Sequence, residues 1–267
     1  MFADIKKLFS YRELLVRLIK KELKVKYRGS ALGFFWSLLN PILTMLVYSF
    51  VFSIVLMRGG EIKQFAIFFI CALLPFNFLQ NSVNYGSNSI IANTNLVNKI
   101  YFPREILPLS AVFSNMVNFF FELIALFIVL ASMGYRFYLF LYILPLLIFI
   151  QFFLVTGMTL LVSALNVFFR DLQHLITIVM MVWFFGTPII YPLSMVPERF
   201  QPFIKFINPM TIYTAYYRNI FYYVKYPENA GFPSVLETVT ALGVTLLIFF
   251  IGYFVFKKLE PKFAEEI

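Results

Sequence analysis

The first 57 residues join a basic, amphipathic segment to a long stretch without charged side chains. The uncharged stretch, Leu32 to Met57, is long enough to cross a lipid bilayer. At about 100° per residue, Ser10 to Arg28 places basic and apolar side chains on opposite helical faces, and only Glu22 interrupts the apolar face. The pattern predicts either an interfacial helix at the membrane surface or a charged leader that only orients the first span. The residues expected to act in an interfacial helix are Arg17, Lys20, Lys21, Lys24, Tyr27 and Arg28.

The composition excludes a water-soluble fold. Of the 267 residues, 61% are hydrophobic and 13% are charged, whereas soluble domains carry about 25% charged residues. The net charge of +9 does not indicate nucleic-acid binding, because nine of the 22 Lys and Arg residues precede Ala31 and others gather in segments expected in the cytoplasm. We therefore expect membrane lipids, and no nucleic acid, among the partners.

Six stretches have the length and apolar character of transmembrane helices. They are Leu32 to Met57, Phe65 to Ile90, Ile106 to Met133, Phe137 to Leu165, Leu175 to Tyr191, and Val235 to Phe256. Their even number and the distribution of charge predict that both termini are cytoplasmic. We predict an all-α integral membrane protein, with a cytoplasmic segment over residues 1–31, a six-span domain over 32–256 and a cytoplasmic tail over 257–267.

The segment between spans five and six, residues 192–233, is too aromatic for an ordinary loop. Ser194 with Pro197 is expected to start one short helix, and Asn208 with Pro209 a second. These helices are expected to be re-entrant on the outer side. The tyrosines here indicate either an aromatic belt at the lipid headgroups or a surface that contacts a polymer at a gate.

Chemically reactive side chains are scarce in the predicted spans. Glu122 is the one charged residue deep in a span, where it is expected to face protein or water. Cys71 is the only cysteine and His174 the only histidine, so we predict no catalytic residue and no metal site. The chain has no Gly-Lys dipeptide and hence no P-loop, so it is not a P-loop ATPase by itself.

Neutral polar side chains are more informative. Asn81, Asn84 and Asn88 recur every three or four residues along the second span, and Asn118 lies on the third. Such a stripe either bonds helices together or lines a wet path. The residues we expect along a substrate path or gate are Asn81, Asn84, Asn88, Asn118, Phe184, Tyr191, Tyr213 and Tyr217.

Five blocks of the sequence carry a family resemblance: YRGSALGFFWSLLNP from Tyr27, NLVNKIYFPREILP from Asn95, LNVFFRDLQH from Leu165, TPIIYPLSMVPERF from Thr187 and INPMT from Ile207. These blocks resemble the permeases of type-2 ABC exporters, in particular the bacterial polysaccharide branch with its Wzm-type O-antigen and TagG/TarG-type teichoic-acid exporters. They occur in the family's order and cover nearly the whole chain.

The resemblance implies a half-transporter in the bacterial cytoplasmic membrane, in which two copies of this chain pair with two copies of a separate ATPase subunit. A lipid-linked glycan or teichoic acid passes between the permeases, and ATP and Mg are bound by the partner only. It further implies that residues 91–105, here named the coupling segment, enter a groove of the ATPase. The expected contacts are Asn98, Lys99, Tyr101, Phe102, Arg104 and Glu105, with Arg170 and Asp171 as a smaller second contact or as residues that cap the fifth span.

Two other functional classes stay open at this point. The first is an integral-membrane enzyme acting on polyprenyl-linked sugars, for which Glu105, Asp171 and His174 are the candidate residues. The second is a channel or carrier that works without ATP.

Overall fold

The computed structural model describes residues 8–26, 30, 33–51, 62–227 and 230–266. Over these ranges the chain is helical and contains no strand. The principal helices are α2 (Arg12–Lys26), α3 (Trp36–Phe50), α4 (Phe65–Ser87), α5 (Thr94–Lys99), α6 (Ile106–Ser132), α7 (Leu144–Phe168), α8 (Leu172–Phe185), α9 (Gln201–Ile207), α10 (Pro209–Phe221), α11 (Val235–Leu259) and α12 (Phe263–Glu266). The predicted all-helical class is confirmed for the described residues.

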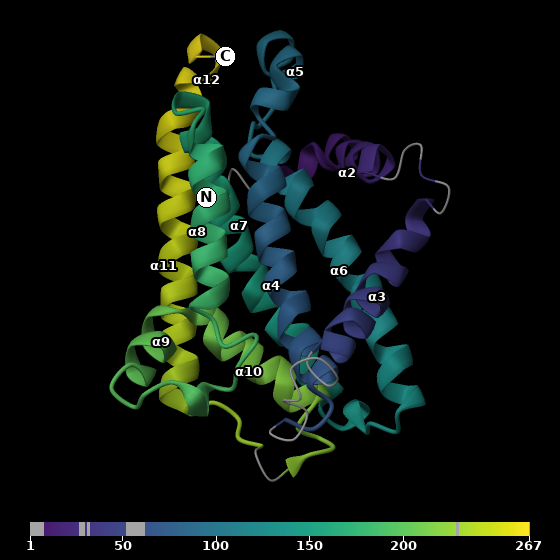
Figure 1. Ribbon diagram of the computed structural model, residues 1–267. Coiled ribbons are helices and arrows are strands. Elements are labelled where there is room, and N and C mark those ends of the chain that lie inside the picture. Colours follow the sequence, from purple (N-terminus) through teal and green to yellow (C-terminus); the bar gives the residue numbers. More distant parts are fainter. Residues whose placement is uncertain (1–7, 27–29, 31–32, 52–61, 228–229, 267) are drawn as a thin grey trace.

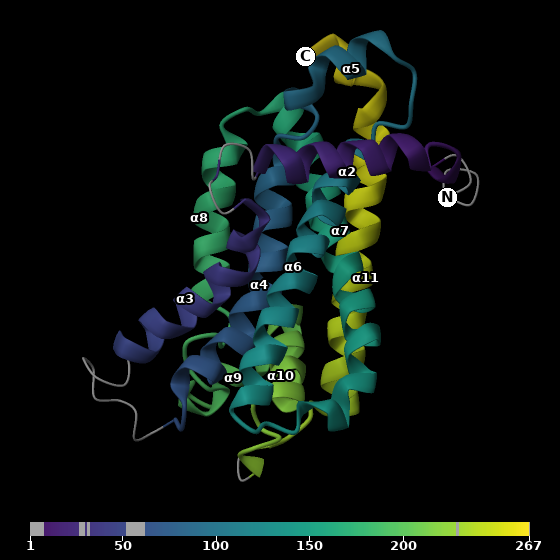
Figure 2. The ribbon, with the colours of Figure 1, turned by 90° about the vertical axis from the view of Figure 1, so that its right-hand side faces the viewer.

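The six longer apolar helices run back and forth between two ends of a bundle (Figure 1). Helices α2, α5 and α12 lie at one end, which we name the α5 end, and α9 and α10 lie at the other, the α10 end (Figures 1 and 2). Helix α2 crosses the α5 end roughly perpendicular to the bundle, as an interfacial helix would (Figure 2). The beginning and the end of the described chain therefore lie on the same side.

Four of the six helices are long and apolar enough to cross a membrane: Phe65–Ser87, Ile106–Ser132, Phe137–Phe168 and Val235–Glu266. Two shorter apolar helices, Leu38–Tyr48 and Leu172–Phe185, occupy the places of the predicted first and fifth spans. The predicted bounds of the fifth span were wrong, because α8 starts at Leu172 and stops at Phe185, where Gly186 and Pro188 interrupt the helix. Six complete spans stay a prediction.

Helix α10 lies inside the bundle, packed against α4, α7 and α11. The Gln151 side chain of α7 donates a 2.7 Å hydrogen bond to the Pro75 carbonyl of α4 and accepts one of 2.8 Å from the Tyr217 hydroxyl of α10. All three residues are buried, and the network satisfies their polar atoms without water. It fixes the depth of α10 relative to its neighbours.

The start of α10 follows the prediction and the start of α9 does not. The Asn208 side chain caps α10 by accepting a 3.0 Å hydrogen bond from the Met210 amide, and Pro209 occupies the first turn. The expected helix at Ser194 and Pro197 is wrong: a single 3₁₀ turn spans Leu193–Met195, and α9 begins at Gln201 with a proline in its first turn. Proline suits that turn because the first helical amides need no partner.

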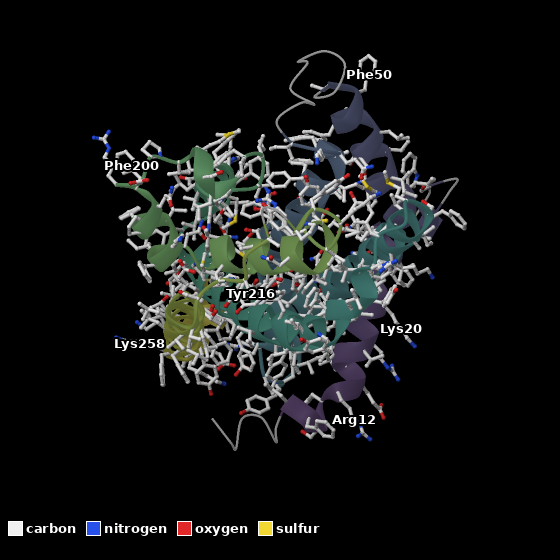
Figure 3. All side chains as sticks on the ribbon, turned by 90° about the horizontal axis from the view of Figure 1, so that it is seen from below. Arg12, Lys20, Phe50, Phe200, Tyr216 and Lys258 are labelled. Atoms are coloured by element: carbon white, nitrogen blue, oxygen red, sulfur yellow. The ribbon has the colours of Figure 1, made fainter. Side chains whose placement is uncertain are left out.

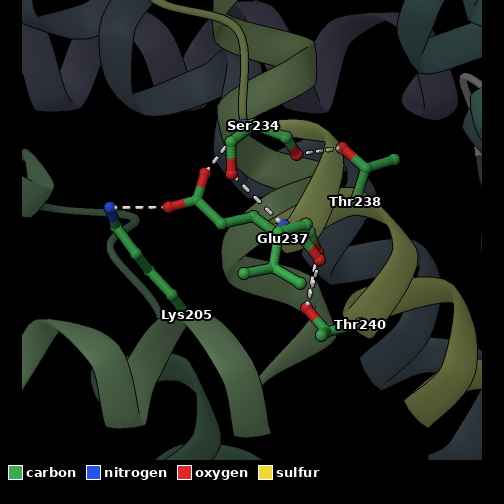
Figure 4. Close-up of polar contacts among 6 residues, drawn as sticks. Lys205, Ser234, Glu237, Thr238 and Thr240 are labelled. Atoms are coloured by element: carbon green, nitrogen blue, oxygen red, sulfur yellow. Dashed lines mark hydrogen bonds and ion pairs between the residues drawn. The ribbon is translucent and has the colours of Figure 1, made fainter.

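Helices α7 and α11 approach each other closely at two glycines. A methyl group placed on Gly252 would lie 2.0 Å from the Gly157 carbonyl oxygen, far inside van der Waals contact. Small residues allow such an approach of backbones in membrane proteins. At the other end of α11, Ser234 and Glu237 form a capping box, and Glu237 pairs with Lys205 of α9 at 2.8 Å (Figure 4). These contacts hold the last long helix in place.

Candidate functional site at the two ends of the bundle

The coupling segment projects from the α5 end (Figures 1 and 2). Its short helix α5 is followed by Ile100 and Tyr101, whose exposed fractions are 54% and 83%. Asn98 and Lys99 are exposed as well. An exposed tyrosine next to an exposed isoleucine, on a segment that projects from the bundle, is the kind of anchor that protein partners bury.

The other residues of the coupling segment that were predicted to contact the ATPase pack against this chain instead. Phe102 is buried, and the buried Glu105 carboxylate forms an ion pair with Lys257 of α11. The backbone amide of Arg104 donates a 3.2 Å hydrogen bond to the Glu260 carboxylate, and its guanidinium donates to the Glu260 carbonyl. Lys257 also pairs with Glu260 at 3.1 Å. This cluster clamps the base of the coupling segment to the end of α11.

Arg170 and Asp171 lie in the turn between α7 and α8, at the α5 end, and both are exposed. Asp171 holds the N-cap position of α8, but its side chain makes no capping hydrogen bond. The surface position suits a contact with a partner better than a capping role. That contact stays a prediction.

Helix α2 is docked on α6 through the residue that interrupts its apolar face. The Glu22 carboxylate accepts hydrogen bonds of 2.8 Å from the hydroxyls of Ser110 and Ser114, one on each oxygen. Burial raises the pKa of Glu22 above its ordinary value. Lys21 adds a 2.9 Å hydrogen bond to Asn93, next to the coupling segment's helix. Helix α2 is therefore held by polar contacts as well as by its apolar face.

The basic face of α2 points away from the bundle. Arg12 and Lys20 extend outward in the view from the α10 end (Figure 3), and Arg17 and Lys24 are exposed too. Tyr27 and Arg28 lie outside the described residues. Basic side chains facing outward from a membrane-surface helix attract anionic headgroups.

Residues predicted along a substrate path fall into two groups. Asn81, Asn84 and Asn88 on α4 are half-buried, whereas Asn118 on α6 is buried. Near this region Lys26 of α2 lies over the Tyr85 ring at 5.5 Å, and the Glu122 side chain is half-buried. A wet path along the asparagine stripe stays a prediction.

The aromatic residues of the predicted gate lie at the C-terminal end of α8, in the segment that follows it and on α10. Phe184 packs edge-on against Phe76, and the Tyr191 hydroxyl donates a 2.7 Å hydrogen bond to the Phe185 carbonyl. Tyr213 and Tyr217 are buried in the bundle, where Tyr213 bonds Thr245 of α11. The second pair therefore fixes the position of α10 in this arrangement, and its part in a gate stays a prediction.

Sequence reasoning missed the buried Arg218 on α10. Its guanidinium donates hydrogen bonds to the carbonyls of Phe68, Pro188 and Ile189 at 3.2, 2.6 and 2.6 Å, and it stacks over the Phe68 ring at 3.6 Å. The available signal was a single cation among apolar and aromatic residues, on the same helical face as Thr211 and Thr214. Arg218 joins α4, α10 and the turn after α8.

In the described ranges, no three His, Cys, Asp or Glu side chains come together as metal ligands do, and Cys71 is buried. The features that remain are a projecting coupling segment, a docked surface helix and an aromatic end with a buried arginine.

Comparison with known proteins points to one class. Residues 13–222 match the family described as ABC-2 type transporter. A protein of Myxococcus xanthus named O-antigen export system permease protein RfbA is 34% identical over 268 residues, covering all of both chains. Two proteins of Klebsiella pneumoniae with the same name are each 32% identical over 254 residues, which is 95% of this chain and 94% of theirs.

Proposed function

Because the chain belongs to the ABC-2 type transporter family, as a permease of the Wzm-type branch, we propose that it is the membrane subunit of an ATP-driven exporter of a lipid-linked polysaccharide. The observation that carries the proposal is the match to an O-antigen export permease over the full length of both chains. We propose an O-antigen-type glycan as the substrate on the same ground, with teichoic acid as the alternative polymer.

The energy source is a separate cytoplasmic ABC ATPase, present in two copies. The sequence contains no P-loop, so ATP and Mg are bound by the partner. The contact is made by the coupling segment, with Ile100 and Tyr101 as exposed anchors and Asn98 and Lys99 beside them in the chain, and Arg170 and Asp171 form a smaller second contact. The cluster of Glu105, Lys257 and Glu260 transmits movement of the segment to α11.

The proposed topology places the α5 end in the cytoplasm and the α10 end outside. Helices α3, α4, α6, α7, α8 and α11 are the six spans, both termini are cytoplasmic, and α9 and α10 are re-entrant from the outer side. Helix α2 lies at the cytoplasmic surface, where its basic face meets anionic headgroups, including that of the incoming lipid carrier.

The exporter contains a second copy of this chain, and the glycan passes between the two. The proposal places the second copy against α3 and α8, each of which presents a row of exposed apolar side chains that lipid or the second copy would cover. On α8 these are Leu175, Ile178, Val179, Met181, Val182 and Phe185, and on α3 they are Leu43, Leu46, Val47 and Phe50.

A pair of matched variants tests the coupling contact. Tyr101→Ala removes the most exposed aromatic anchor, whereas Tyr138→Ala removes a tyrosine of 62% exposure at the α10 end. We expect Tyr101→Ala to weaken copurification of the ATPase subunit about tenfold or more, because hot-spot truncations cost about 2 kcal/mol or more. Tyr138→Ala should leave it unchanged. Equal copurification by both variants would contradict the proposed contact.

A further inference from the structure

We propose that a cavity at the α10 end, lined by Arg218 and three tyrosines, binds an acidic sugar unit of the exported glycan as it leaves the bilayer. The inference rests on the proposed function and adds a binding site and a substrate class to it. The cavity lies between α10, the turn after α8 and the start of α4.

The size and the composition of the cavity suit a small polar ligand. Its volume is about 730 Å³, within the range of about 300–1,000 Å³ typical of ligand sites. Its wall has polar and aromatic side chains in close proximity. The residues that the argument uses are Lys63, Thr211, Arg218, Tyr222, Tyr223 and Tyr226.

The wall carries positive charge. Arg218 and Lys63 both line the cavity, and none of the described residues that line it is a carboxylate. The three hydrogen bonds of Arg218 all end on backbone carbonyls, which hold the guanidinium in place without neutralising it. A guanidinium has five N–H donors, so it retains donors for a ligand. Arg218 has no carboxylate partner among the described residues; a buried cation in that position is costly, and an anionic ligand would compensate it.

A hydroxyl group in the wall lacks a partner. Thr211, on the same face of α10 as Arg218, is 3% exposed, and its Oγ1 has no hydrogen-bond partner in the part of the chain that the structure describes. A buried hydroxyl without a partner is unfavourable. Because Oγ1 is buried, a sugar hydroxyl would pair with it only after the Thr211 side chain turns toward the cavity that this residue lines.

The aromatic side of the wall favours a sugar over a lipid phosphate. Tyr222, Tyr223 and Tyr226 lie in the turn region directly after α10, and the Tyr222 hydroxyl donates a 2.7 Å hydrogen bond to the Lys63 carbonyl, which fixes that ring. Aromatic rings offer the apolar contact that sugar rings need, together with polar groups at their edges. A phosphate headgroup would bind through the positive charge alone. A sugar that bears a carboxylate would use the positive charge, the hydroxyl groups and the aromatic rings of the wall.

Binding to the purified complex of permease and ATPase tests the proposal. The complex is placed in nanodiscs of zwitterionic lipid, without ATP, and titrated by calorimetry with glucuronic acid, with glucose and with inorganic phosphate. We expect the uronate to bind at least tenfold more tightly than glucose, and phosphate to compete poorly. Binding of phosphate as tight as that of the uronate, or loss of uronate binding in nanodiscs with anionic lipid, would assign the cavity to headgroups and overturn the proposal.

Two variants locate the binding to this cavity. Thr211→Val keeps the shape of the side chain and should weaken uronate binding about fivefold, because one hydrogen bond of about 1 kcal/mol is lost. Thr240→Val removes a hydroxyl of α11 that does not line the cavity and should change nothing. Equal effects of the two variants would refute the site. Failure of uronate binding while the ATPase remains bound would overturn this inference alone, whereas absence of the ATPase partner would overturn the proposed function.

Discussion

The contact between Glu22 and α6 gives the sharpest single test of how the surface helix is held. Replacing Glu22 with Ala removes the carboxylate that accepts hydrogen bonds from Ser110 and Ser114. These bonds are the polar part of the contact of α2 with α6, in addition to the hydrogen bond between Lys21 and Asn93. The variant should therefore loosen α2 without removing any of its basic residues.

The magnitude follows from opposing contributions. Hydrogen bonds to a charged group contribute about 1.5–3 kcal/mol each, so two give an upper bound of about 3–6 kcal/mol. Burial of the carboxylate, which raises the pKa of Glu22, offsets part of this. Each serine hydroxyl also lies within 3.0 Å of a carbonyl of its own helix, so neither is left without a partner. We expect a net loss of about 1–2 kcal/mol, equivalent to about a 5–30-fold change in the docking equilibrium.

Hydrogen exchange measured by mass spectrometry on the nanodisc complex follows the docking directly. The amides of Arg12–Lys26 should exchange faster in Glu22→Ala by about the same factor, because undocking exposes them more often. Glu13→Ala changes the same residue type at an exposed position of the same helix and serves as the control. Its effect should be smaller than about 1 kcal/mol, from the helix dipole alone.

One result would refute the reasoning. Alanine has a higher helix propensity than glutamate, so a helix that merely floats on the membrane would be equally or better protected in Glu22→Ala. Unchanged or increased protection would show that the contacts with Ser110 and Ser114 do not hold α2.

Three further predictions follow from named contacts. Docking raises the pKa of Glu22, so this residue stabilises the docked state most at a pH below its ordinary pKa of 4.5, and the stabilisation is lost as the pH rises through the raised pKa. The protection of the α2 amides, corrected for intrinsic exchange, should therefore increase as the pH is lowered from 7. Glu22→Gln should abolish this trend. Gly252→Ala should destabilise the protein by about 1–3 kcal/mol in thermal unfolding, because its methyl group meets the backbone of α7, whereas Gly243→Ala, with open space around it, should not; equal stability would refute the close approach. Glu105→Gln should lower the amount of glycan moved per ATP several-fold, because its ion pair with Lys257 is lost, and an unchanged ratio in proteoliposomes would contradict the transmission proposed for that cluster.

Features that depend on local periodicity were predictable from the sequence. The opposite faces of Ser10 to Arg28 predicted a helix, which is found at Arg12–Lys26, and the apolar runs predicted the long helices. Asn208 and Pro209 predicted the start of α10, because a helix cap depends only on residues that are adjacent in the sequence. Helix ends that depend on competing prolines and glycines, as at the start of α9 and the end of α8, were placed several residues away from their true positions.

Features that depend on distant partners were not predictable from a single sequence. Glu22, which interrupts an apolar face, accepts hydrogen bonds from Ser110 and Ser114, and these partners lie 88 and 92 residues further along the chain. Arg218 is satisfied by carbonyls up to 150 residues away, so its burial could not be inferred from its neighbours. The projection of Tyr101 beside the buried Phe102 likewise required the end of α11 to be in place.

Reconstitution of transport tests the central claim most directly. The purified chain, its ATPase subunit and the lipid-linked glycan are placed in liposomes, and the glycan that becomes accessible on the side opposite the ATPase is measured with and without ATP. The account predicts movement only when both subunits and ATP are present, with the two subunits recovered in equal amounts. Movement of the glycan by this chain alone, without ATP, would contradict it.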